Sequence, residues 1–243
     1  MKSEPDSAES PDAGRQTVSR ADDLPNIAAS DLNEDQMLAV LQRPATTAET
    51  LALLSRNPEA MKSRKVALAL VMHPRTPRHV AIPALRRLFT FDLMQVALTP
   101  VVAADIKRAA EEQILNRLES LSIGERISLA RRASGRVAAA VLQDTEPRIV
   151  ATALENRRLT EAHVVAVLTK PEASGSLFEV ISEHPRWSLR REVQIALLRS
   201  ENTPIDRAKE FARTFPREFL REVVPEGRLS LISGDVSGIS SSE

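Results

Sequence analysis

Histidine is the residue type in this sequence best suited to hold a metal ion or to move a proton at neutral pH. The chain has four histidines, His73, His79, His163 and His184, and it has no cysteine. No two histidines lie four residues apart and His-Glu-x-x-His does not occur, so a helical zinc site is not predicted. Without cysteine, disulfides and thiolate chemistry are excluded. His73 and His184 each precede a proline, and we expect them to cap the carbonyl end of a helix.

Motifs for nucleophilic and phosphate chemistry are missing from the sequence as well. Ser237 in Gly-Asp-Val-Ser-Gly does not have the spacing of a Gly-x-Ser-x-Gly nucleophile turn. No glycine-rich loop that could cradle a phosphate occurs. Glu111 and Glu112 follow Lys107 and Arg108 by one helical turn, which is typical of ion pairs on a solvated surface. The sequence therefore predicts a protein that is not an enzyme and that needs no cofactor or metal.

Arginine doublets and a single tryptophan are the remaining candidates for a binding function. The doublets are Arg86-Arg87, Arg131-Arg132, Arg157-Arg158 and Arg190-Arg191. Aligned on one face they would suit phosphate groups, but they are out of register and no stacking aromatics accompany them, so a solvated surface is the alternative. Trp187 is expected either to anchor a partner or to fill a junction between helix pairs. The candidate partner-binding residues are Arg157, Arg158, Trp187, Arg190 and Arg191.

The composition favours helices over strands. Aromatic residues make up 3% of the chain, tyrosine is absent, and there are only seven glycines. None of these glycines forms the Asn-Gly or Asp-Gly pairs of tight hairpins. The apolar residues are mainly alanine and leucine, which are strong helix formers. We therefore expect an all-α fold.

The net charge of zero conceals an uneven distribution of charge along the chain. Residues 1–35 carry three basic and nine acidic side chains, a net charge of −6, and residues 225–243 carry −2, so residues 36–224 carry +8. No apolar stretch follows Met1, which argues against a secretory signal. The longest apolar run, 66–72, falls far short of the roughly 20 residues that span a bilayer. We expect a soluble, cytoplasmic protein with acidic ends and a mildly basic body.

A short alanine–threonine motif recurs four times along the chain. Each copy places a threonine seven residues after an alanine, as in Ala39–Thr46, Ala69–Thr76, Ala153–Thr160 and Ala196–Thr203. We expect the alanine to mark close helix packing and the threonine hydroxyl to cap the next helix. Pro77 and Pro204 then take the first helical position. The copies follow one another at steps of 30, 84 and 43 residues, which indicates a unit of about 42 residues, counted twice in the longest step.

Caps and helix breakers predict about fourteen short helices with connections of two to five residues. Thr46 or Thr47 is expected to open the second helix, a further helix is expected over residues 59–72, and Ser122-Ile-Gly-Glu125 has the pattern of a capping box. These helices fall within residues 30–224, which we expect to form one repeat domain. The flanking segment 1–29 is rich in Ser, Pro, Asp and Glu and is predicted to be a disordered acidic segment. The segment 225–243, rich in Gly and Ser, is predicted to be a flexible tail.

Several short motifs resemble those of helical repeat proteins. They are His73-Pro74-Arg75, His184-Pro185-Arg186, Asn57-Pro58, Thr76-Pro77 and Thr203-Pro204. In this pattern the chain resembles the degenerate HEAT-like repeat proteins of bacteria, and it is also similar to the variant leucine-rich repeats. The resemblance covers residues 30–224 and implies a right-handed α-solenoid, a superhelix of the HEAT and armadillo type.

These observations predict a non-enzymatic scaffold on which a partner protein or peptide docks. The alternative is a nucleic-acid-binding protein that uses an arginine-rich concave face, by analogy with the HEAT-like DNA glycosylases. Those enzymes use a catalytic carboxylate framed by aromatic residues, a constellation that this sequence does not offer. A partner is expected under either prediction, and insertion into a membrane under neither.

Overall fold

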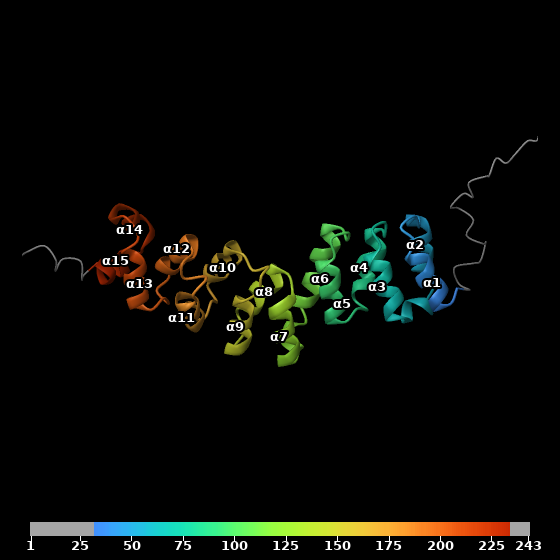
Figure 1. Cartoon of the computed structure of the whole chain (residues 1–243), viewed down its shortest axis with the longest axis horizontal. Helices are drawn as coiled ribbons and strands as arrows, with labels where there is room; N and C mark the ends of the chain where they lie inside the picture. Colours follow the sequence, from blue (N-terminus) through green and yellow to red (C-terminus); the bar gives the residue numbers. More distant parts are fainter. Residues whose placement is uncertain (1–31, 234–243) are drawn as a thin grey trace, which may run out of the picture.

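The computed structural model describes residues 32–233, and every regular element in that range is a helix (Figure 1). The α-helices are α1 (Glu34–Leu41), α2 (Ala48–Leu54), α3 (Arg64–Met72), α4 (Arg78–Leu85), α5 (Thr90–Leu98), α6 (Ala104–Leu115), α7 (Ile123–Arg132), α8 (Gly135–Val141), α9 (Pro147–Leu154), α10 (Glu161–Leu168), α11 (Gly175–Glu183), α12 (Arg191–Arg199), α13 (Ile205–Ala212), α14 (Arg217–Val223) and α15 (Glu226–Ser233). Two 3₁₀-helices, η1 (Ala60–Lys62) and η2 (Leu118–Ser120), lie in longer connections. The all-α prediction is confirmed for the described residues, with fifteen α-helices in place of about fourteen.

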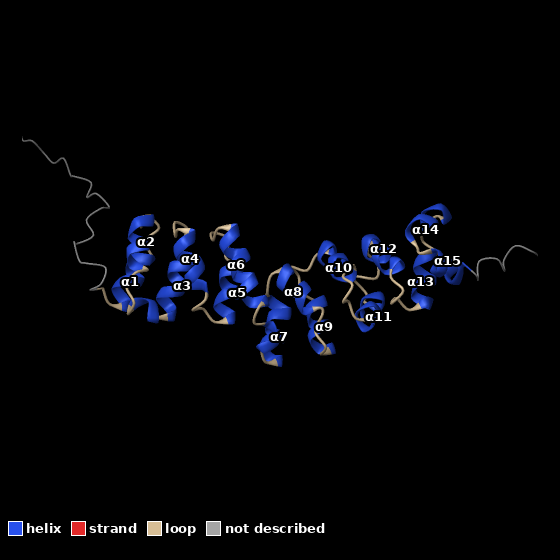
Figure 2. Cartoon of the chain, turned by 180° about the vertical axis from the view of Figure 1, so that it is seen from behind, coloured by secondary structure: helices blue, strands red, loops and turns tan. Residues whose placement is uncertain are grey.

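The helices follow one another in chain order along the long axis of the molecule (Figures 1 and 2). The main packing contacts join helices that are neighbours in the chain and helices two places apart, such as α1 with α3, α4 with α6, and α10 with α12. Even-numbered helices from α4 to α14 are connected in this way without a break. The short connections cause this arrangement, because a helix joined to the previous one by a few residues cannot move away from it and packs against it.

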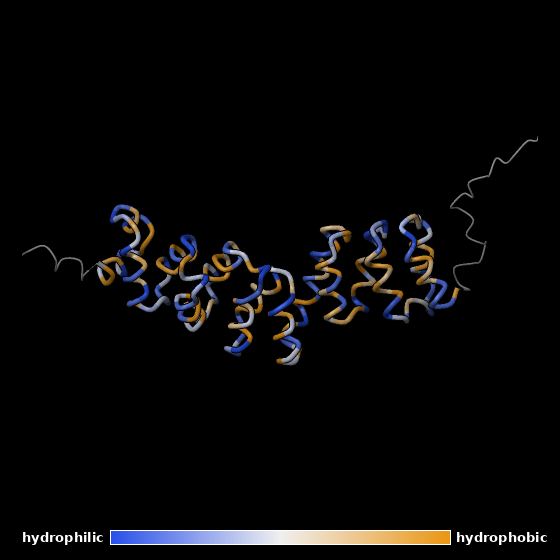
Figure 3. The backbone as a smooth tube through the Cα atoms, viewed as in Figure 1, coloured by the Kyte–Doolittle hydropathy of each residue, from blue (hydrophilic) through white to orange (hydrophobic). Residues whose placement is uncertain are grey.

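One continuous core of buried apolar side chains runs between the helices from Met37 in α1 to Ile232 in α15. Figure 3 shows apolar and polar segments alternating along each helix, as expected when one face of a helix is buried. Alanines such as Ala67, Ala81 and Ala153 are fully buried in this core. Their small side chains allow neighbouring helices to approach closely. Of the four repeated alanines, Ala153 and Ala196 are buried, Ala69 is half-buried and Ala39 is exposed, so the predicted close packing is wrong at Ala39.

The helix pair repeats at a shorter interval than the sequence indicated. The first helices of successive pairs begin at residues 34, 64, 90, 123, 147, 175 and 205, so the steps range from 24 to 33 residues. The predicted unit of about 42 residues is therefore wrong. Three copies of the alanine–threonine motif lie at the end of the first helix of a pair. The fourth copy lies at the end of α12, which is the second helix of its pair. The 84-residue step thus spans three pairs, not two.

Three of the four repeated threonines do not cap the next helix. Thr46, Thr76 and Thr203 are buried, and each hydroxyl donates to a main-chain carbonyl six residues earlier, in the helix that has just ended. The acceptors are Val40, Leu70 and Leu197, at 2.8, 2.5 and 2.7 Å. Each carbonyl also accepts an i+3 main-chain bond, at 3.1, 3.3 and 3.2 Å, and the hydroxyl adds a donor at the C-terminal end of the helix.

The cap positions of the following helices belong to other residues. Thr47 caps α2, while Pro77 and Pro204 occupy the N-cap positions of α4 and α13, one place earlier than predicted. Thr160 is the exception, because its hydroxyl accepts from the main-chain N–H of His163 at 3.4 Å. The predicted cap is confirmed at Thr160 alone among the four.

Of the two predicted end segments, the structure describes only the start of the second. The segment predicted as a tail from residue 225 begins with helix α15, whose Ile232 is buried against the core. The predicted disordered segment 1–29 and the rest of the predicted tail lie outside the described residues. The predicted helix 59–72 is divided at Ser63, which caps α3 and separates it from η1.

Candidate functional site

Two phenylalanine side chains are exposed at the start of α5. Phe89 precedes the helix and is 63% exposed, and Phe91 in its first turn is 38% exposed. The chain has only six phenylalanines, and leaving two of them in water forgoes part of the hydrophobic stabilisation that burial would give. Phe89 and Phe91 are two residues apart in the chain, and aromatic side chains are enriched in protein-binding surfaces.

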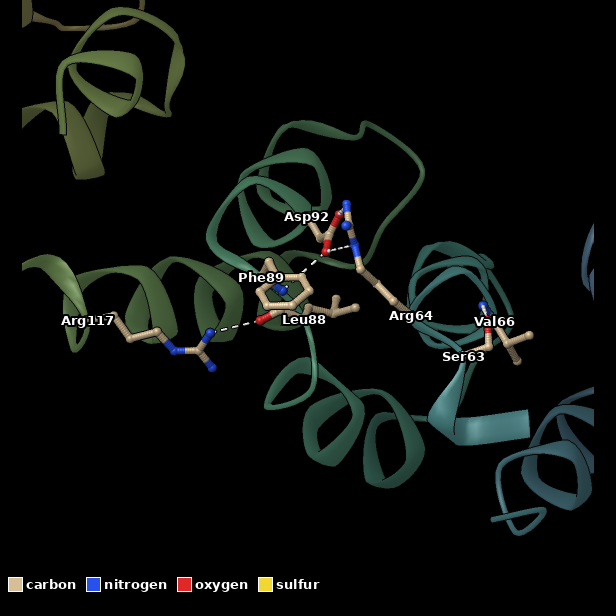
Figure 4. A network of polar contacts seen from close by, with 7 residues as sticks. All are labelled: Ser63, Arg64, Val66, Leu88, Phe89, Asp92 and Arg117. Carbon is tan, nitrogen blue, oxygen red and sulfur yellow. Dashed lines mark hydrogen bonds and ion pairs between the residues drawn. The ribbon is translucent and has the colours of Figure 1, made fainter. Parts of the chain in front are cut away.

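Phe89 lies beside an ion pair that joins α3 to α5 (Figure 4). Arg64 in α3 binds the carboxylate of Asp92 through both oxygens, at 2.7 and 2.8 Å, and its guanidinium lies 5.1 Å from the centre of the Phe89 ring. Asp92 is 3% exposed and also accepts from the main-chain N–H of Phe89 at 3.2 Å. The hydrogen bond and the charge of Asp92 raise the pKa of Arg64 above its ordinary value, so this cation stays charged under all ordinary conditions.

The loop before α5 is fixed from its other side by Arg117, in the α6–α7 connection. Arg117 donates to the main-chain carbonyl of Leu88 at 2.8 Å and to that of Arg86 at 3.3 Å, and Figure 4 shows the first of these bonds.

Arg132, at the end of α7, lies 5.9 Å from the centre of the Phe91 ring. We call Arg64, Phe89, Phe91 and Arg132 the phenylalanine surface. Its loop is preorganised, so a partner would not have to order it on binding.

The segment that leads to this surface is basic throughout. Residues 60–91 contain seven basic and no acidic side chains. The seven are Lys62, Arg64, Lys65, Arg75, Arg78, Arg86 and Arg87. Four of them form ion pairs with residues outside the segment, and Arg75 and Arg87 donate to main-chain carbonyls. This run of basic residues is visible in the sequence, but the net charge of +8 over residues 36–224 does not show where the basic residues gather.

Trp187, one of the candidate partner-binding residues, is buried at the junction between two helix pairs. Trp187 is 1% exposed, and its indole N–H donates to the carbonyl of Leu154 at 3.0 Å. The guanidinium of Arg186 lies 4.2 Å from its ring centre. This placement fits the alternative prediction, in which Trp187 fills the junction between helix pairs.

The four candidate arginines lie on two neighbouring loops. Arg157 and Arg158 belong to the α9–α10 loop, while Arg190 and Arg191 lie at the start of α12. The two loops meet where the Nε2 of His184 lies 3.2 Å from a carboxylate oxygen of Glu155. All four arginines are exposed, although Arg158 donates to a main-chain carbonyl and Arg191 lies over the rings of two phenylalanines. Their role in binding stays a prediction.

Arginines recur as connections between successive helix pairs. Seven of them donate to a main-chain carbonyl 25 to 30 residues earlier, which is about one helix pair. The donor and acceptor residues are Arg75 and Ala45, Arg87 and Met61, Arg117 and Leu88, Arg158 and Arg132, Arg186 and Leu159, Arg207 and Ser182, and Arg228 and Thr203. We call this set the arginine ladder. The planar guanidinium has enough donors to bind a main-chain carbonyl about one helix pair back, so much of the arginine content serves the fold.

The histidines before proline also connect helix pairs. His73 is buried, and its Nε2 lies 3.1 Å from the carbonyl oxygen of Arg43, in the preceding pair. Its Nδ1 accepts from the N–H of Arg75 at 3.2 Å, and His184 accepts in the same way from Arg186 at 3.1 Å. The predicted contact with a carbonyl is present at His73, but the carbonyl belongs to another helix pair. Among residues 32–233, no group of His, Asp and Glu side chains could hold a metal ion.

Comparison of the chain with protein-family models, with curated protein sequences and with solved structures finds no match. Within residues 32–233, no helix is both long and apolar enough to cross a membrane.

Proposed function

We propose that this protein is a non-enzymatic scaffold of the HEAT-like α-solenoid type, which binds a partner protein through the phenylalanine surface. The observation that carries the proposal is the pair of exposed rings of Phe89 and Phe91, held on a loop that Arg64 and Arg117 fix from two sides. A rigid aromatic anchor supplies contact area at little entropic cost, which is how interface hot spots gain their energy.

The packing of the helices supports the solenoid part of the proposal. Each helix packs mainly on its neighbour and on the helix two places away, as expected for stacked repeats that contact only adjacent units. The pairs step by 24 to 33 residues, below the roughly 40–47 residues of HEAT and armadillo units. The likeness is therefore to the stacking of helix pairs and not to the length of the repeat.

The chemistry of the surface specifies the kind of partner. The exposed rings favour an aromatic or long aliphatic side chain. Arg132 lies beside the Phe91 ring, so an acidic residue on the partner would meet complementary charge there. We infer a partner segment with an apolar anchor and acidic flanks.

Site-specific crosslinking tests this proposal on the full chain. A photo-reactive phenylalanine in place of Phe89 should capture one protein from native lysate, and Phe91→Ser in the same chain should reduce capture about tenfold or more. The matched control places the photo-reactive residue at Leu231, which is 63% exposed in α15 and should not capture that protein. Equal capture at both positions, or turnover of a metabolite by purified protein that captures no partner, would contradict the proposal.

Nucleic-acid binding is the second candidate, because nucleic acid bases stack on exposed rings beside arginines. The basic segment 60–91 would add phosphate contacts, but six of its seven cations already have partners within the chain. Fluorescence anisotropy with a labelled single strand and a labelled duplex would decide. Binding that weakens steeply with salt and requires Phe89 would favour this candidate, whereas no binding at about 50 mM salt would eliminate it.

A further inference from the structure

A cavity of about 290 Å³ opens between α2, η1 and α4. Its walls are formed by Ala52, Ser55, Arg56, Met61, His79, Val80, Pro83, Ala84 and Arg87. The volume is close to the lower end of the range for small-molecule pockets, roughly 300 Å³. The cavity is therefore large enough for one compact molecule.

The side chains that line the cavity have one sign of charge. Arg56, His79 and Arg87 bring three nitrogen-bearing groups to its walls, and no carboxylate lines it. Arg87 is positioned by a hydrogen bond of 2.9 Å to the carbonyl of Met61. An arginine held in this way can direct its remaining N–H groups at an anion, because one guanidinium carries five donors.

The floor of the same cavity is apolar. Met61, Val80 and Ala84 are all buried and line it together with Pro83. An inorganic ion alone would leave this floor in contact with water. A ligand with a small apolar part would cover it and gain hydrophobic free energy.

We propose that this cavity, the α2–α4 pocket, binds a small molecule that carries one phosphate or carboxylate group on a compact apolar body. The charged group meets Arg56, His79 and Arg87, and the apolar body lies on Met61, Val80 and Ala84. Phosphate and carboxylate both match the planar donor geometry of arginine. The proposal is independent of the phenylalanine surface, because none of that surface's residues lines the pocket.

Calorimetric titration of the full chain at constant ionic strength tests the proposal. The probes are inorganic phosphate, phenyl phosphate and benzoate, so that the charged group and the apolar body vary separately. Saturable binding at one site is expected, with phenyl phosphate or benzoate tighter than inorganic phosphate. The preference between those two identifies the charged group. Equal affinity for all three probes would overturn the role of the apolar floor, and no saturable binding of any would overturn the proposal.

Two matched variants place the binding in the cavity. Arg56→Gln removes a cation from its wall and should weaken binding about tenfold, the effect of losing one charge-assisted hydrogen bond. Arg86→Gln removes the same charge from an exposed residue that does not line the cavity and should leave the affinity unchanged. Equal weakening by both variants would mean that net charge alone attracts the probes, and no effect of Arg56→Gln would mean that they bind elsewhere. Circular dichroism confirms that both variants are folded.

Discussion

Several buried polar side chains donate hydrogen bonds to main-chain carbonyls at helix ends, where main-chain donors are few. Thr46, Thr76 and Thr203 do this with hydroxyl groups, and Asn156 does it with an amide. Asn156 is 1% exposed and donates to the carbonyls of Ala130 and Ala133 at the end of α7. Such bonds matter because a buried carbonyl without a donor is costly.

We expect Thr76→Val to lower the free energy of unfolding by about 1 kcal/mol, because the shape of the side chain is kept and one buried hydrogen bond is lost. Thr152→Val is the control, since the Thr152 hydroxyl bonds to Arg148 within α9 at an exposed site. Urea unfolding of both variants measures the difference. Equal losses would show that the buried hydroxyl has no special role.

Ser122 and Glu125 form the capping box that begins α7, as the sequence predicted. The carboxylate of Glu125 accepts hydrogen bonds from the Ser122 hydroxyl and from the Ser122 main-chain N–H. Both bonds lower the pKa of Glu125, the hydroxyl more than the N–H. A lowered folded-state pKa contributes stability above the unfolded pKa, and this contribution is lost as the pH falls through the folded pKa. Ser122→Ala should therefore raise the pKa of Glu125 toward its ordinary value, which NMR titration of the carboxyl carbon measures. An unchanged pKa would contradict the assigned cause.

At the scale of elements, the approach of α8 to the α9–α10 loop leaves no room for a side chain at Gly135. A Cβ atom there would lie 2.3 Å from the carbonyl oxygen of Arg158 and 2.4 Å from the ring of His163. Gly124 in α7 has open space around it. The two glycines lie in the first turns of neighbouring helices, so they form a matched pair.

Gly135→Ala should destabilise the fold by about 1–3 kcal/mol, because either helix α8 or the facing loop must shift. Gly124→Ala should stabilise it by about 0.5 kcal/mol, since alanine loses less backbone entropy in a helix. Thermal unfolding of the two variants gives the sign of each effect. A destabilising Gly124→Ala, or a neutral Gly135→Ala, would disagree with this packing.

At the scale of the whole molecule, the core and the arginine ladder connect each helix pair mainly to its neighbours. Stability in such an array is approximately a sum over units and their interfaces. A substitution that weakens the contact between two helix pairs should therefore lower the local stability of the adjacent helices more than that of distant helices.

Asn156→Asp provides that test, because it turns a carboxylate toward the carbonyls of Ala130 and Ala133. We expect a loss of about 3 kcal/mol at neutral pH. The introduced acid should have a raised folded-state pKa, so the loss should diminish as the pH is lowered. Hydrogen exchange read by mass spectrometry should show faster exchange in α7–α10 and little change in α1–α4. A uniform increase in exchange would indicate one cooperative unit instead.

Much of the local structure was predictable from the sequence, because composition, caps and breakers act over a few residues. The all-α class, the capping box at Ser122, the cap at Thr160 and the close packing at Ala153 all follow from such local patterns. Only the tertiary structure decided the direction of side-chain bonds between residues 25 to 30 positions apart. For that reason the arginine ladder was not predictable from spacing alone, and the two predictions for Trp187 stayed open. The three buried threonines bond only six residues back, but spacing left open whether each hydroxyl faces the helix that has just ended or the next one. The exposure of Phe89 has the same cause, since burial depends on which helices lie opposite, and that is fixed by the stacking of the whole array.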